Sequence, residues 1–104
     1  MSSQLSLPAV CLFKDAASIA QQLNAAFLVE RQSSQNHHFR FEVDCSNVTA
    51  MDSSLLAVLL DLKRRAQAGQ QTLAVLNPPV NLRRLAKLYG LDTLLLDGEA
   101  DTSL

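Results

Sequence analysis

The sequence predicts an α/β fold, with a mixed, largely parallel sheet of four or five strands and helices covering mainly one face. Strand-like and helical segments alternate along the chain, which implies crossover connections between parallel strands. In residues 39–45 apolar and polar side chains alternate strictly, as in a sheet with one buried and one wetter face. A length of 104 residues with 48% hydrophobic content suits one core, so we predict a single domain, 1–104, that frays from about residue 97.

The first third of the chain predicts short strands and one helix. Residues 4–7 alternate between polar and apolar, and a proline separates them from the apolar stretch 9–13, which is typical of one or two strands with a bend. Asp15 occupies a helix N-cap position, and apolar residues follow at helical spacing as far as about Arg31. The polar stretch 32–38 predicts a surface loop.

The rest of the chain continues the alternation. The helix after the central turn has a cationic last part and a terminal glycine, and the next helix has prolines in its first turn, as helix ends favour. The predicted segments are, in order, a strand over 39–45, a turn over 46–52, a helix to Gly69, a strand over 72–76, a helix from Pro78 to Tyr89 and a last short strand over 94–96.

Composition narrows the classes of function. Nine basic and 10 acidic residues leave a net charge of −1, which provides no general attraction for nucleic acid or anionic lipid. Neither a leader peptide nor an apolar run of about 20 residues is present, so we expect a cytoplasmic protein without direct membrane insertion. Cys11 and Cys45 lie in apolar segments without CxxC spacing, and we expect buried, reduced thiols.

The sequence lacks most of the motifs and residue clusters that enzymes use for catalysis. The three glycines stand far apart, so no glycine-rich phosphate loop is present. His37 and His38 are adjacent in a polar segment, which favours an exposed pair over a metal site. Asp44 and Asp52 could serve acid and base chemistry or hold magnesium, but a strand end and a helix cap explain them at least as well. We therefore predict a protein that is not an enzyme and has no cofactor or metal.

The turn at Asp52, Ser53 and Ser54 is the strongest candidate for a functional site. It begins an apolar helix, where Asp52 or Ser53 can cap unpaired backbone N–H groups. A phosphate on either serine would meet the positive end of the helix dipole and would add charge to the surface that docks there. We interpret the turn first as a helix cap, second as a docking surface and third as a phosphorylation switch.

Two clusters of cations form a second candidate surface. One cluster is residues 63–65, and the other consists of Arg83, Arg84 and Lys87 in the following predicted helix. Such runs are usually solvated helix faces, and they also suit an acidic partner.

Residues 39–95 resemble the STAS family, named for sulfate transporters and anti-sigma factor antagonists. The family pattern is a strand ending in aspartate, a short turn, an Asp-Ser-Ser-Gly or Asp-Thr-Gly-Gly helix start and a leucine-rich helix; Asp44 and Asp52 occupy its two aspartate places. The resemblance implies a helix-covered sheet and a role in binding proteins. The segment LAKLYGL, 85–91, is similar to the small STAS subunit of the Mla phospholipid transporter, which binds the cytoplasmic ATPase of its ABC complex.

The resemblance assigns roles to individual residues. Ser54 matches the serine that is phosphorylated in anti-sigma factor antagonists, and Ser53 matches the threonine of the lipid-transport members. Leu55 stands where the family usually has glycine, so we expect its side chain to obstruct a partner that approaches the backbone closely.

Two binding functions follow from the resemblance. The first is an adaptor, held at the inner-membrane face through its partner, that docks on an ABC-transporter ATPase. Its predicted surface consists of Asp52, Ser53, Ser54, Leu55, Arg83, Arg84, Lys87 and Tyr89. The second is an anti-sigma factor antagonist whose partner kinase phosphorylates Ser54. A small enzyme or nucleotide-binding domain using Asp44 and Asp52 is the third alternative, and the oligomeric state is left open.

Overall fold

The alternating segment around Phe41 forms the middle strand of a three-stranded sheet in the computed structural model of the protein. The structure describes residues 2–33, 40–69 and 71–95. Strand β3 (Arg40–Asp44) lies between β1 (Ser2–Ser6) and β5 (Thr72–Leu76), and both pairings are parallel. Strands β2 (Val10–Cys11) and β4 (Ala50–Met51) form a second, two-stranded parallel sheet. The predicted α/β class is confirmed, with five strands divided between two sheets that are parallel throughout the described residues.

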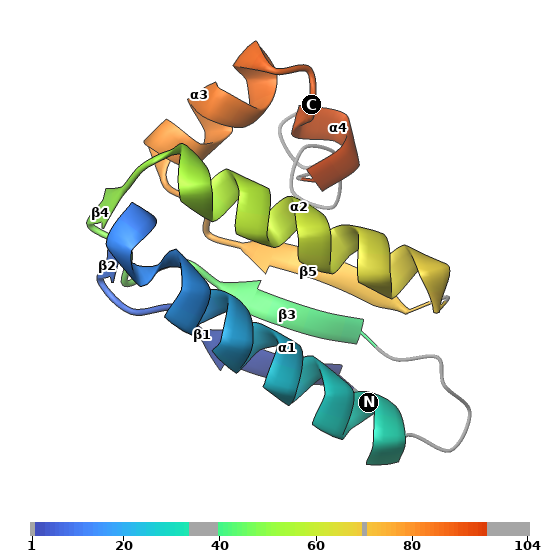
Figure 1. Ribbon diagram of the computed structural model, residues 1–104. Helices are drawn as coiled ribbons and strands as arrows, with labels where there is room; N and C mark the ends of the chain where they lie inside the picture. The colour runs from blue at the N-terminus through green and yellow to red at the C-terminus, as the bar shows by residue number, and fades with distance from the viewer. Residues whose placement is uncertain (1, 34–39, 70, 96–104) are drawn as a thin grey trace.

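Helices cover one face of the larger sheet. Figure 1 shows α1 (Ala16–Ser33) and α2 (Ser53–Ala68) side by side across that face, with α3 (Val80–Leu88) and α4 (Asp92–Leu95) beyond α2. Within the described parts of the chain, no helix combines the length and apolar character that a membrane span requires.

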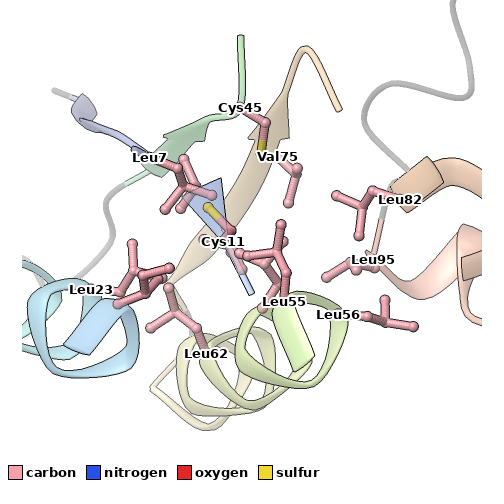
Figure 2. Packing of buried hydrophobic residues seen from close by; sticks show 14 of the residues in the cluster. Leu7, Cys11, Leu23, Cys45, Leu55, Leu56, Leu62, Val75, Leu82 and Leu95 are labelled. Carbon is pink, nitrogen blue, oxygen red and sulfur yellow. The ribbon is translucent and has the colours of Figure 1, made fainter. Parts of the chain in front are cut away.

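The two faces of β3 differ as its alternating sequence predicts. Phe41 and Val43 are fully buried, and Phe41 meets Phe27 of α1 edge to face, with ring centroids 5.7 Å apart. On the opposite face Arg40 lies beside Glu42, with Nε and Oε2 2.7 Å apart. Figure 2 shows the core on the buried side, where leucines from several elements surround Cys11. Cys11 and Cys45 are free and buried, as predicted.

The helix ends follow the local chemistry of the sequence. Gly69 ends α2, where its N–H donates to the carbonyls of Arg65 and Ala66. After α3, Gly90 adopts a left-handed φ of 70° while its N–H and that of Leu91 donate back to Lys87 and Ala86. This Schellman arrangement needs a residue that tolerates positive φ, which glycine does without steric cost.

Three expectations about the elements need correction. The stretch predicted as a last strand, 94–96, belongs to α4 as far as Leu95, because Asp92 starts a helical turn after the glycine. The predicted turn over 46–52 contains β4, whose partner β2 lies 40 residues earlier in the chain. Gln32 and Ser33 extend α1 instead of starting a loop. The remainder of that loop, with His37 and His38, lies outside the described residues, as does the predicted tail.

A short 3-10 helix, η1 (Phe13–Asp15), comes between β2 and α1. Asp15 therefore does not act as the N-cap of α1. Its Oδ2 instead accepts from the Leu12 N–H at 3.2 Å, and its own N–H donates to the Leu12 carbonyl at 2.8 Å. These two bonds close a tight turn that ends the apolar stretch 9–13 and changes the direction of the chain.

Candidate functional site

The carboxyl ends of the three parallel strands meet at one end of the molecule. Ser6, Asp44 and Leu76 lie in register there, so the segments that follow the strands gather beyond this edge of the sheet. Figure 1 shows β2, β4 and the start of α2 at the same end. The predicted turn at Asp52 therefore occupies the edge at which parallel α/β sheets commonly carry their functional groups.

Asp44 joins two strand ends. Its Oδ1 accepts from Asn77 Nδ2 at 3.0 Å and from the Ser46 N–H at 3.0 Å, and its Oδ2 accepts from the Ser46 hydroxyl. The Asn77 hydrogen bond, followed by the bond from the Ser46 N–H, lowers the pKa of Asp44 below its ordinary value. Asn77 adopts a left-handed φ of 53°, a conformation that asparagine tolerates better than most residues. These bonds explain Asp44 as a structural link between β3 and β5.

Asp52 holds two segments of the chain together. Its Oδ1 accepts from the Ser54 N–H at 3.0 Å and caps α2, while its Oδ2 accepts from the Phe13 N–H at 2.9 Å. The pKa of Asp52 is lowered by the hydrogen bond from the Ser54 hydroxyl, then by the Phe13 and Ser54 N–H groups. One carboxylate thus fixes the start of α2 against η1, and the turn has a defined shape before any partner binds.

The two serines differ in accessibility. Ser54 is half-buried, and its hydroxyl donates to Oδ1 of Asp52. Ser53 is exposed as the first residue of α2. The more accessible hydroxyl of the pair therefore belongs to Ser53.

Leu55 lies inside the core, contrary to the expectation that it would face a partner. Only 2% of the residue is exposed, and Figure 2 shows its side chain among buried residues of the core. Leu55, Leu59 and Leu62 follow at helical spacing along the buried side of α2. The leucine therefore packs inward and does not obstruct an approach to the turn.

Helix α3 presents its cations outward. Leu82 and Ala86 face the core, and the other side of the helix exposes Arg83, Arg84 and Lys87. In the described parts of the chain, none of these three cations lies within ion-pair distance of a carboxylate.

The predicted residues of α3 do not all lie beside the turn. In Figure 1, α3 begins near the start of α2 and then runs away from it. The exposed Tyr89 follows the last residue of α3 and so lies at the far end from Ser53.

Phe13 is a surface residue that the sequence did not single out. It is 79% exposed, the most exposed large hydrophobic side chain among the described residues. The predicted strand within 9–13 covers only Val10–Cys11, and a strand gave no reason to expect a projecting aromatic ring at Phe13. The spacing of Leu12 and Asp15, which suits a capping turn, is the signal that could have placed Phe13 on the surface.

The described residues offer little for metal chemistry. No group of three or more histidine, cysteine or acidic side chains is arranged there to hold a metal ion. Burial raises the pKa of Cys45 to about 12, which leaves the thiol protonated and a poor nucleophile at neutral pH.

These features define a small two-layer α/β domain with a hydrogen-bonded turn, exposed at Ser53, at the carboxyl edge of its sheet. A family model described as "Mlab, STAS domain" matches residues 2–97, and the chain therefore belongs to the STAS domain family. STAS domains are generally non-catalytic regulatory or adaptor domains that mediate protein–protein interactions. No curated protein matches the chain.

The lowered pKa of Asp52 predicts how the fold responds to acid. A carboxyl group whose pKa falls on folding stabilises the folded state above its ordinary pKa of 3.8, and this contribution disappears as the pH drops through the lowered value. We expect Asp52→Asn to lose less stability than the wild type between about pH 5 and pH 2, because asparagine can cap the helix but cannot ionise. Urea unfolding followed by circular dichroism across this range measures the difference. Parallel losses in both proteins would show that Asp52 is not an acid-sensitive contact.

Proposed function

We propose that the chain is a non-catalytic adaptor that binds and regulates the cytoplasmic ATPase of an Mla-type phospholipid ABC transporter. The observation that carries the proposal is the exposed Ser53. It lies in a turn whose Asp52 accepts hydrogen bonds from both Phe13 and Ser54. The description of the matching family model, which contains the term Mlab, supports this branch of the family. The adaptor would work in the cytoplasm, held at the inner-membrane face by its partner.

The docking surface we propose consists of the exposed residues of the turn and of α3. Asp52 shapes the turn, Ser53 lies at its tip, and Arg83 and Arg84 add positive charge on the neighbouring helix. A preorganised surface loses little conformational freedom on association, so a larger share of the contact energy contributes to affinity.

The geometry of Ser54 argues against the alternative function, an anti-sigma factor antagonist switched at this residue. A kinase would have to separate the Ser54 hydroxyl from Asp52, and the product would place a phosphate of about −1.5 to −2 charge beside that carboxylate. Repulsion between these like charges would weaken the cap of α2. Because Ser54 is half-buried and its hydroxyl is already bonded to Asp52, it is less accessible to a kinase than Ser53.

Substitution of Ser53 tests the adaptor function. We expect the tagged wild type to copurify with an ABC ATPase from its own host, and Ser53→Arg to reduce the recovered ATPase at least about tenfold, because a bulky cation at the tip blocks close approach. Quantitative mass spectrometry of the eluates measures the recovery.

Ala25→Arg supplies the control for that experiment. Ala25 is exposed in the middle of α1, well after η1 in the chain, so an arginine there adds the same bulk and charge outside the proposed surface. Its ATPase recovery should equal that of the wild type. Absence of any ATPase from the wild-type eluate would refute the adaptor function, and equal losses in both variants would remove Ser53 from the docking surface.

A further inference from the structure

Phe13 combines high exposure with a fixed backbone. Its N–H donates to Asp52 at 2.9 Å, and the paired bonds between Leu12 and Asp15 close the turn around it. An exposed aromatic ring on a mobile segment would lose freedom when it is bound. On this turn the backbone is already ordered, so burial of the ring against a partner has a low entropic cost.

Two exposed apolar residues shortly before Phe13 in the chain are also held in place, while the exposed Lys14 follows it. Ala9 and Val10 are exposed, and the carbonyl of Ala9 accepts from the N–H groups of Thr49 and Ala50 at 2.8 and 3.1 Å. We call Ala9, Val10 and Phe13 together the η1 patch. Single exposed hydrophobic residues are common on proteins, but several within five residues of the chain, with hydrogen-bonded backbone and beside a candidate docking turn, suit an interface.

The η1 patch and α3 lie on opposite sides of the start of α2. The Phe13 N–H donates to Asp52, the residue that precedes Ser53, and α3 packs on α2 and begins near its start (Figure 1). This end of the domain therefore has an apolar side at Phe13 and a cationic side at Arg83 and Arg84. A complementary partner surface has an apolar pocket with acidic side chains to one side of it.

We propose that Phe13 is the apolar anchor of the interface with the ATPase, where it fills an apolar pocket bordered by acidic residues. The inference rests on the proposed adaptor function and adds to it a contact residue and the chemistry of the partner's surface. A few buried anchors, often aromatic, contribute most of the affinity of a protein interface, and surrounding charges contribute more to the association rate.

The test compares Phe13→Ala with Val29→Ala for binding to the purified ATPase. Val29 is a suitable control because it is also largely exposed, at 65%, but lies near the far end of α1. By surface plasmon resonance we expect Phe13→Ala to weaken binding about 30-fold or more, mainly through faster dissociation, and Val29→Ala to bind like the wild type. The thermal midpoints of both isolated variants should match that of the wild type, since neither side chain belongs to the core.

Each other outcome has a separate meaning. If the wild type binds the ATPase and Phe13→Ala binds equally well, the anchor is refuted while the adaptor function stands. If the wild type itself does not bind, the adaptor function fails and the inference falls with it. If sedimentation shows that the isolated wild type is a dimer and Phe13→Ala a monomer, the patch binds a second copy of the chain and the proposal is overturned.

Discussion

Replacing Phe41 by alanine should lower the free energy of unfolding by about 3 to 5 kcal/mol. The side chain is fully buried in the middle strand of the sheet, and its ring packs edge to face on Phe27, so truncation removes apolar burial and leaves a cavity between β3 and α1. Urea unfolding monitored by circular dichroism measures the change. This is the largest loss of stability that we expect from a single substitution in the chain.

Arg40→Ala is the control for that measurement, because Arg40 precedes Phe41 on the same strand and points to the opposite face. It pairs with Glu42 on the exposed surface, and loss of such a pair costs at most about 1 kcal/mol. Phe41→Leu should lie between the two, since leucine retains much of the buried apolar volume. Similar losses for Phe41→Ala and Arg40→Ala would contradict the assignment of a buried and an exposed face to β3.

The segments predicted well are those in which local sequence and tertiary packing demand the same structure. The strict alternation around Phe41 fixed the inward face of β3, and the apolar run of Thr72–Leu76 coincides with β5. The leucine spacing after Ser53 and the terminal Gly69 marked the limits of α2. Each of these patterns involves residues of one element only, so a single sequence is enough to predict that element from it.

The errors occurred in segments too short to show a period, and in one of them a distant contact determines the local structure. Ala50 and Met51 form a strand because Val10 and Cys11 lie beside them, and two residues are too few to show a period. Leu94 and Leu95 suit a strand or a helix equally well by composition, and the turn that Gly90 closes leads into the helix.

The site shows the same division between local and distant effects. The cap formed by Asp52 on Ser54 follows from neighbouring residues, and Asp52 was one of the two caps that the sequence suggested. The bond from Phe13 to Asp52 spans 39 residues and could not be read from either segment alone. Leu55 points inward because that side of α2 packs on the core. The expectation that it would obstruct a partner compared only the size of leucine with that of the glycine usual in the family.

The cations of α3 lead to the second large expected effect, which concerns the rate of association. Arg83→Glu combined with Arg84→Glu should slow association with the ATPase about 10- to 100-fold at low ionic strength, because both arginines are exposed and face a partner surface that we expect to be acidic. Stopped-flow or surface plasmon resonance measurements at several salt concentrations give the rates. The difference from the wild type should narrow as salt screens the charges.

A second charge-reversed variant separates a local contact from the effect of net charge. Arg31→Glu with Arg64→Glu changes the formal net charge by the same four units, from −1 to −5, but places the new charges on α1 and the distal half of α2. If α3 faces the ATPase, this variant should associate much faster than the α3 variant. Equal slowing of both variants would mean that only the overall charge of the protein matters. Unchanged association of both would remove α3 from the interface, and the turn and the η1 patch would remain as candidate contact surfaces.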